Sequence, residues 1–399
     1  MALVAAGVNP RPDDDHGRSG VALLALGFRP FYLLAGIFGA ASVLLWVAQF
    51  AGWLGSAVAF SGAPWHAHEM LFGYAFAVIT GFLFTAVRNW TQRPTPTGAA
   101  LAGLALLWLT GRVLALTPWA AWSAATDTAF ALGVALGIGR PLIASGNRRN
   151  YFFIVLVLAL GAANLAFHAA LHGLVPFSAG AALTVGLDVV LLTIAIVAGR
   201  VVPMFTNNAI RGAGARRVAA IEYTVLGSVL ALIAADLAGA AVIATAVAAI
   251  GALAHGARLA LWAPWATRRT PLVWILHASY AWIVVHLALR AAAGLDWVTP
   301  SLATHALTIG GIGGMTLGMM TRSALGHSGR PLAARGYEVA SYVLIQIAAA
   351  ARVLVPIAVP AWHVAGVALS GLAWGAAFTV FVFAYWPILT RPRVDGRPG

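Results

Sequence analysis

Two histidines and a glutamate stand together in the segment WHAHEM, residues 65–70, directly before the apolar run LFGYAFAVITGFLF. Imidazole nitrogen is a common ligand for haem iron and for copper, and a neighbouring carboxylate can tune such a ligand or carry protons. His66 and His68 are two positions apart, which is about 200° around an ideal helix. We therefore expect the two histidines to face different neighbours and to serve different sites.

The composition is that of a polytopic membrane protein. The chain has 399 residues, of which 61% are hydrophobic and 9% charged, with a mean hydropathy of +0.88. It contains no cysteine, which excludes disulfides, thiolate metal sites and iron–sulfur clusters. The net charge of +13 comes from arginines that lie between apolar runs. This pattern indicates membrane topology and not a nucleic-acid partner.

Twelve apolar runs are long enough to cross a bilayer, which takes about 20 residues. They lie at 30–50, 67–87, 99–117, 119–139, 151–172, 179–202, 218–237, 239–261, 272–292, 301–321, 337–356 and 361–388. The sequence thus predicts an all-α integral membrane protein with twelve transmembrane helices. We expect a membrane domain at 27–390, between an N-terminal tail at 1–26 and a C-terminal tail at 391–399.

The arginines alternate with the helices. Of the 24, 21 fall in the two tails and in every second connection. The positive-inside rule then places both termini in the cytoplasm. The polar start NPRPDDDHGRSG lacks the features of a signal peptide and is interpreted as a cytoplasmic tail. The three exceptions, each near a periplasmic helix end, are Arg112, Arg290 and Arg352.

Spacings repeat along the chain at intervals of four helices. Gly81, Gly199 and Gly318 are 118 and 119 residues apart, and His168 and His286 are also 118 apart. Three four-helix repeats would explain these offsets. Chance is the other explanation, because glycine is abundant in the chain.

Most histidines fall in one layer. Seven of the eleven are predicted to lie in the periplasmic half of the membrane: His66, His68, His168, His172, His286, His305 and His363. A single membrane histidine usually makes a hydrogen bond between helices, whereas seven in one layer favour haem or another metal. His168 and His172 are one turn apart and should share a face.

Other polar and small residues leave two interpretations each. Glu69, Asp127 and Asp188 lie within apolar spans and are either proton carriers or neutral hydrogen-bonding partners. The three exceptional arginines could bind haem propionates or extend to lipid headgroups. Met315 and Met319 share a helix face and either bind Cu(I) or pack. The stripe Gly310, Gly314 and Gly318 allows close helix packing or a flat porphyrin against the backbone.

Three long motifs carry a family resemblance. WHAHEMLFGYAFAVITGFLFTAVRNWT, GRVVPMFTNNAIRG and HALTIGGIGGMTLGMMTRSALGHSGRPL resemble the NnrS family, haem-containing membrane proteins of the bacterial nitric oxide response. The resemblance extends from about Gly27 to Trp386. It implies twelve helices in the bacterial inner membrane, one or two bound haems with copper, and a role in nitric oxide metabolism or tolerance. The haem would be b-type, since no cysteine is present for covalent attachment.

The topology is also similar to that of the catalytic subunit of haem–copper oxidases and nitric oxide reductases. In that subunit, histidines near the periplasmic ends of helices two and ten hold a low-spin haem, and His68 and His305 occupy similar places. Its second metal site uses histidines on helices six and seven, where this chain has Asp188, Glu222 and Asp236. The histidines left for a second centre are His168, His172, His286 and His363.

Three functions remain open from the sequence. The first is an oxidoreductase that acts on nitric oxide at a periplasm-side haem, with Glu69 and Asp188 as candidate catalytic carboxylates. Its partners would be the lipid bilayer and an unidentified electron donor. The second is a transporter of a small solute or metal, which broken helices in paired repeats would support; no convincing pair is visible. The third is a sensor that binds nitric oxide without turnover.

The topology can be tested with a reporter fused after Pro398. A reporter active only in the periplasm should stay inactive at this position, because the arginine-rich segments remain cytoplasmic. A cytoplasm-active reporter at the same position serves as the control and should be active. The opposite pair of activities would contradict the predicted orientation.

Overall fold

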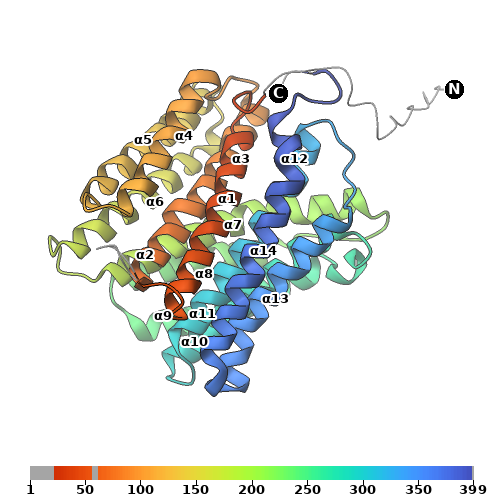
Figure 1. The fold of residues 1–399 in the computed structure, drawn as a ribbon. Coiled ribbons are helices and arrows are strands. Elements are labelled where there is room, and N and C mark those ends of the chain that lie inside the picture. Colours follow the sequence, from red (N-terminus) through yellow and green to blue (C-terminus); the bar gives the residue numbers. More distant parts are fainter. Residues whose placement is uncertain (1–21, 56–61, 398–399) are drawn as a thin grey trace.

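The computed structural model describes residues 22–55 and 62–397. Residues 1–21, and with them most of the predicted tail at 1–26, lie outside the described part. Within that part every regular element is a helix, and the chain forms twelve helical spans (Figure 1). The predicted fold class is confirmed.

The spans follow the predicted order. In sequence they are α1 (Phe28–Phe50); α2, η1 and α3 (Gly62–His68, Glu69–Ala75, Phe76–Thr91); α4 (Gly98–Ala115); α5 (Ala121–Ala144); α6 (Phe152–Leu171); α7 (Ala179–Ala209); α8 (Ala219–Leu237); α9 (Ala241–Leu261); α10 (Pro271–Gly294); α11, η4 and α12 (Pro300–His305, Ala306–Gly313, Gly314–His327); α13 (Gly336–Ala358); and α14 (His363–Thr390). Short 3₁₀ turns, η2 (Arg148–Asn150), η3 (Pro264–Thr267) and η5 (Pro360–Trp362), stand in three connections.

Eleven of these helices are long and apolar enough to cross a membrane by length and composition. The remaining span is helix ten (α11, η4 and α12), whose many glycine and threonine residues make it less apolar than the other eleven. Several helices extend beyond the predicted apolar runs, and α7 continues to Ala209. Helical backbone hydrogen bonds continue into polar sequence, whereas hydropathy marks only the apolar part of a helix.

The helices form a closed bundle. Consecutive helices pack against each other, and α14 returns to pack against α1 (Figure 1). Helix two (α2, η1 and α3), α7 and helix ten (α11, η4 and α12) meet inside this ring: η1 contacts α7, α3 contacts α12, and α3, α7 and α12 line one small apolar cavity. Side chains on these three inner helices are therefore positioned to face the gaps between neighbouring four-helix sets.

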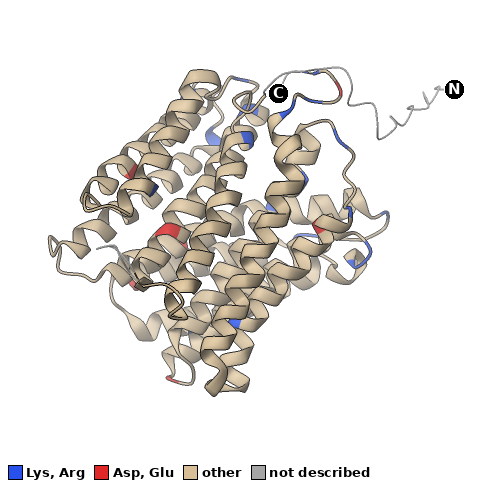
Figure 2. Cartoon of the chain, viewed as in Figure 1, with Lys and Arg blue, Asp and Glu red and all other residues tan. Residues whose placement is uncertain are grey.

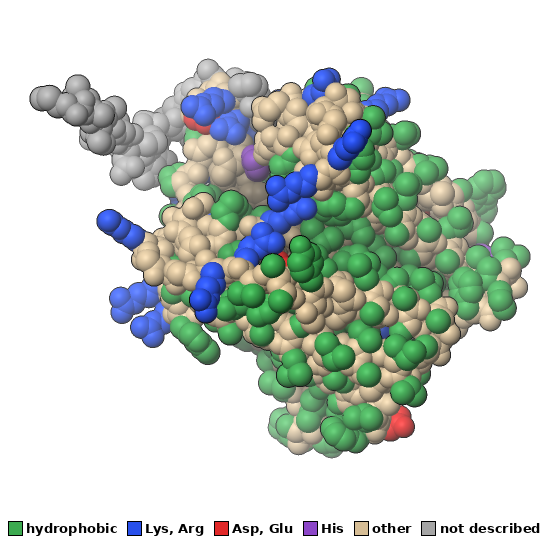
Figure 3. Space-filling model, turned by 180° about the vertical axis from the view of Figure 1, so that it is seen from behind, with side chains coloured by type: hydrophobic (Ala, Val, Ile, Leu, Met, Phe, Trp, Pro, Cys, Tyr) green, Lys and Arg blue, Asp and Glu red, His purple; other side chains and the backbone are tan. Residues whose placement is uncertain are grey.

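Both ends of the described chain lie at the same side of the bundle. The N–H of Ala22 donates to the carbonyl of Thr390 at 2.7 Å, and the buried guanidinium of Arg29 donates to carbonyls at the end of α14. The basic side chains gather along the same margin, with few elsewhere (Figure 2). Seen from behind, hydrophobic side chains cover much of the remaining surface (Figure 3). An even number of membrane crossings places both ends of the chain on one side of the membrane. This agrees with the gathering of the arginines on the side where the two ends lie.

The glycine stripe of helix ten serves helix packing. A Cβ atom on Gly310 would overlap the indole of Trp282, one on Gly314 would overlap Ser279, and one on Gly318 would approach Ile275 to 2.9 Å. All three neighbours belong to α10. Of the two interpretations of the stripe, close helix packing is the one that the structure supports.

The repeat is visible in the first and third helix sets. Gly81 packs against Tyr32 of α1, and Gly318 packs against α10; α1 and α10 are the opening helices of their sets. Gly199 differs, since a Cβ there would overlap the guanidinium of Arg258 on α9. The same glycine thus permits close packing in all three sets, although its partner helix changes in the second.

Replacing Gly310 with alanine should destabilise the bundle, because the added methyl group has no room against Trp282. Overpacking of this kind costs about 1–3 kcal/mol, which thermal unfolding in detergent would detect. Gly227 is the matched control: it lies in α8, is exposed, and a Cβ there meets no atom within 4 Å. Its alanine variant should be as stable as the wild type or slightly more so. Equal stability of the two variants would contradict the packing described for helix ten.

Candidate functional site

Helix two presents its two histidines to opposite sides. The ring of His66 stacks on Trp46 of α1, with centroids 5.0 Å apart. The ring of His68 instead contacts Phe167 and His168 of α6, at centroid distances of 5.0 and 4.8 Å. The expected separation around the helix is confirmed, and it creates two neighbourhoods.

A π-helical segment follows a histidine in both helix two and helix ten. η1 begins directly after His68, and η4 begins directly after His305. π-helical turns are rare and occur frequently at functional sites. The two segments occupy equivalent places in the first and third helix sets, whereas α7 is α-helical throughout. No sequence signal indicated them.

One neighbourhood is a buried ion cluster, here called the Arg112 cluster. Its members come from α2, η1, α4, α5 and α6 and are His68, Glu69, Arg112, Asp127, Asn164 and His168. Arg112 donates through Nη2 to both carboxylate oxygens of Asp127, at 2.5 Å to Oδ2. Its Nη1 atom lies 3.2 Å from Glu69 Oε2, an ion pair without hydrogen-bond alignment. Two carboxylates thus neutralise one buried guanidinium.

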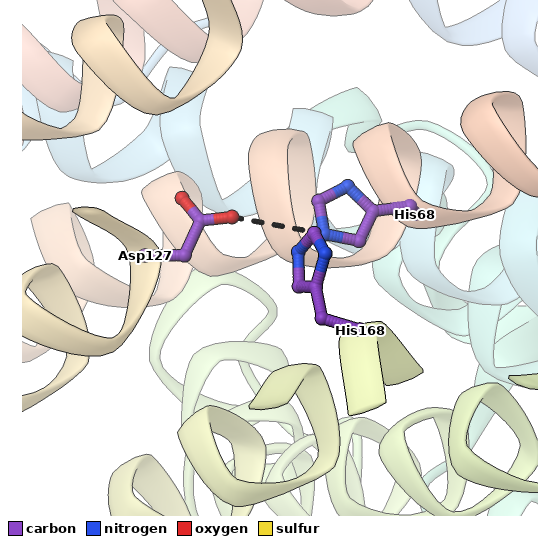
Figure 4. A group of neighbouring side chains, drawn as sticks. All are labelled: His68, Asp127 and His168. Carbon is purple, nitrogen blue, oxygen red and sulfur yellow. Dashed lines mark ion pairs between the residues drawn. The ribbon is translucent and has the colours of Figure 1, made fainter. Parts of the chain in front are cut away.

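His68 is held on both ring nitrogens. Its Nδ1 atom lies 2.9 Å from Glu69 Oε1, and its Nε2 atom lies 3.0 Å from the Oδ1 atom of Asn164. Asn164 also donates through Nδ2 to Asp127 Oδ2 at 3.1 Å. His168 completes the cluster and points toward His68 and Asp127 (Figure 4). Its Nε2 atom is buried and has no hydrogen-bond partner among the described residues.

Two glycines make room for this cluster. A Cβ atom on Gly111 would lie 2.5 Å from Asp127 Oδ1, and one on Gly73 would lie 2.8 Å from Arg112 Nη1. Both approaches are shorter than real Cβ contacts allow. The backbone of η1 and α4 therefore has to lack side chains at these points for Arg112 and Asp127 to meet.

A second ion cluster, the Arg290 cluster, joins α7, α8 and α10. Arg290 donates to Asp188 Oδ1 at 2.8 Å and to Asp236 Oδ2. His286, one turn earlier on α10, donates from Nδ1 to the carbonyl of Ala303 at 2.8 Å, and its buried Nε2 has no partner in the described part of the chain. His168 and His286 are 118 residues apart, and Glu69 and Asp188 are 119 apart. The two clusters therefore follow the internal repeat.

The third neighbourhood is the His305 group, made of His66, His305, Arg352 and His363. Arg352, His66 and His363 lie within electrostatic range of His305, so the four side chains share one neighbourhood. His305 donates from Nδ1 to the carbonyl of Ser301 at 2.7 Å, and Arg352 donates to the hydroxyl of Ser301 at 2.8 Å. Two atoms shielded from solvent, His66 Nδ1 and Arg352 Nη1, have no hydrogen-bond partner among the described residues.

A family model described as NnrS protein matches residues 22–393, nearly the whole chain. The chain belongs to the NnrS family. As a member of this family it is a multi-pass membrane protein of the nitric oxide response. No curated protein matches the sequence.

In this NnrS family protein the structure groups the histidines differently from the prediction made from the sequence. The predicted partner of His305 was His68, but His66 is the one that lies in the His305 group, and His68 faces α5 and α6. The cause is the rotation of about 200° between positions two apart on a helix. His172 is exposed where α6 ends, so it does not share the buried face of His168.

The three exceptional arginines each join one neighbourhood. Arg112 and Arg290 pair with carboxylates and Arg352 with Ser301, so extension to lipid headgroups is not their arrangement. Met315 and Met319 line an apolar cavity of about 70 Å³ between α3, α7 and α12, away from the three groups of histidines. Sequence reasoning missed Asn164; its signal was a lone amide one turn before His168 in an apolar run.

Replacing Arg112 with glutamine should strongly destabilise the protein, since Glu69 and Asp127 would be left as unpaired buried charges. Breaking a buried ion pair in this way costs about 3–5 kcal/mol, measurable by thermal or denaturant unfolding followed by circular dichroism. Arg148 is the control: it is exposed between α5 and α6. Its glutamine variant should unfold like the wild type. Wild-type stability of the Arg112 variant would show that the cluster is not held by this arginine.

Proposed function

We propose that this NnrS family protein binds a b-type haem in the His305 group and acts there as an oxidoreductase on nitric oxide, near the periplasmic surface of the bacterial inner membrane. The observation that carries the proposal is that His66 of helix two and His305 of helix ten lie in one neighbourhood with the buried Arg352, which donates to Ser301 one turn before His305. Family membership supplies the link to nitric oxide.

The residues present fit a haem. His305 donates from Nδ1 to a backbone carbonyl, which fixes the tautomer and leaves Nε2 as the metal-binding atom. Arg352 keeps one buried N–H group without a partner, and guanidinium groups suit haem propionates. Trp46 against His66, and Phe50 against His363, supply aromatic walls. The chain has no cysteine for covalent attachment.

When bound, the haem would supply an iron atom that takes electrons from an external donor and passes them on for the reduction of nitric oxide. The chain itself would hold the iron with His66 and His305 and orient the propionates with Arg352. Glu69 and Asp188 are each paired with an arginine, so neutralising buried charge is the role their contacts support. Their role as proton carriers stays a prediction.

The backbone of helices two and ten favours a cofactor site over a solute path. Transporters of the broken-helix type place unwound backbone at the middle of the membrane. Helices two and ten are paired irregularities in equivalent places, but both continue as hydrogen-bonded π-helix through the irregular segment. Turnover of nitric oxide by the reduced protein would distinguish an oxidoreductase from a sensor.

An absorption spectrum of the purified protein tests the haem. We expect a Soret band, and we expect the His66→Ala and His305→Ala variants to lose the low-spin spectrum because each removes an imidazole that would hold the iron. His277→Ala is the control: this histidine is buried on α10 against Thr206 and the carbonyl of Trp262, and its variant should keep the spectrum. Absence of extractable haem from the wild type would overturn the proposal. Loss of the low-spin spectrum in His68→Ala but not in His66→Ala would overturn the assignment of the ligands.

A further inference from the structure

We infer that His68, Asp127 and His168 form a binding site for one divalent first-row transition-metal ion, separate from the haem proposed above. The three residues come from α2, α5 and α6, and each offers a ligand atom within 4.8 Å of the other two. His68 is fully buried, and Asp127 and His168 are each 4% exposed. The inference uses the geometry of the Arg112 cluster and does not depend on haem at the His305 group.

The spacing of the donor atoms suits a metal. A tetrahedral ion with bonds of about 2.1 Å holds its ligand atoms about 3.4 Å apart. The Nε2 atom of His68 already lies 3.6 Å from Asp127 Oδ2. The rings of His68 and His168 are 4.8 Å apart and nearly perpendicular, so the two imidazoles approach the same point from different directions (Figure 4). A small rotation of His168 would complete the set.

Neighbouring groups already prepare the ligands. Glu69 lies 2.9 Å from His68 Nδ1, the contact by which a carboxylate holds a histidine with Nε2 toward a metal. His168 Nε2 is buried without a hydrogen-bond partner in the described part of the chain. An unsatisfied buried nitrogen costs about 1–3 kcal/mol, and coordination would remove this cost.

The charged groups around the site also favour a cation. The two carboxyl groups of Glu69 and Asp127 contact the single guanidinium of Arg112 in this buried cluster. A metal ion would bring further positive charge beside these carboxyl groups. The rival arrangement is the same hydrogen-bonded cluster without a metal ion.

Asn164 occupies the position where the ion would bind. Its amide bridges His68 Nε2 at 3.0 Å and Asp127 Oδ2 at 3.1 Å, which are two of the three donor atoms. On metal binding the amide would turn away from the three donor atoms. Its removal should leave the three donors intact.

The donor set selects the class of ion. Two imidazoles and one carboxylate suit Fe(II), Zn(II) and Cu(II), and the combination with open positions is typical of non-haem iron centres. Neither thiolate nor thioether is present, so the site does not favour Cu(I). The Arg290 cluster has similar residue types, but among the described residues only His68, Asp127 and His168 are brought together as a group of this kind.

The test measures haem and non-haem metal separately on the full-length protein in detergent. Haem is measured by the pyridine haemochrome, and iron, copper and zinc by mass spectrometry, with haem iron subtracted. We expect one non-haem ion per chain in the wild type. Iron, copper or zinc at this level would each support the site and identify the ion. Stoichiometric haem without any non-haem metal, both as purified and after incubation with each ion, would overturn it.

Three variants locate the metal. His168→Gln should lower metal affinity at least tenfold. Changes to residues that only support a metal ligand lower affinity by about 10–100-fold, and loss of the ligand itself should cost at least as much. His286→Gln is the matched control, because it removes an equally buried histidine with an unpartnered Nε2 from α10. Asn164→Ala should keep the metal. Equal metal content in the His168 and His286 variants would overturn the assignment, as would metal loss in Asn164→Ala with normal haem.

A spectroscopic measurement guards against misfolded variants. Co(II) added to metal-depleted wild-type protein should give visible ligand-field bands, which Zn(II) should then displace. This result needs no substitution and would support a site for divalent ions. Failure of Co(II) and Zn(II) to bind to protein that retains its haem spectrum would leave only the hydrogen-bonded ion cluster. If the wild-type protein binds Co(II) but contains no haem, the proposed function would be contradicted and the metal site would not.

Discussion

The pairing of three arginines inside the bundle, Arg112 and Arg352 buried and Arg290 partly buried, is the constraint on which the interior of this protein depends. A guanidinium inside the hydrocarbon region is expensive unless it is paired and hydrogen-bonded. Arg112 and Arg290 each meet two carboxylates from other helices, and Arg352 meets Ser301 of helix ten. These contacts tie helices to one another near the end of the bundle that has few arginines. Each of the three arginines lies in a neighbourhood that also contains one or more of the histidines.

Helix two connects two of these gaps. Because His66 and His68 leave the helix in nearly opposite directions, the same turn contributes to the His305 group and to the Arg112 cluster. The π-helical segment that begins at Glu69 changes the helical register directly after them. A haem on His66 and a metal ion on His68 would therefore share one rigid backbone segment. Such a connection would let occupation of one site influence the geometry of the other.

The sequence predicts the fold better than the site. Hydropathy and arginine placement define twelve helices, because both effects act along the chain and need no partner. The three exceptional arginines were visible, but their partners were not: Arg290 meets Asp188 across 102 positions, through packing that spacing does not encode. The pairing of His68 with His305 failed for the same reason, since rotation about helix two decides which histidine faces helix ten. Asn164 looked isolated because its partners lie on other helices.

The most direct measurement is an experimental density map of the purified, haem-loaded protein. We expect porphyrin density joined to His66 and His305, with a propionate near Arg352, and a separate compact peak between His68 and His168. Porphyrin density joined to His68 would contradict the division of helix two between two centres. A continuous hydrogen-bonded cluster with no peak between His68 and His168, in protein that contains stoichiometric haem, would contradict the metal site.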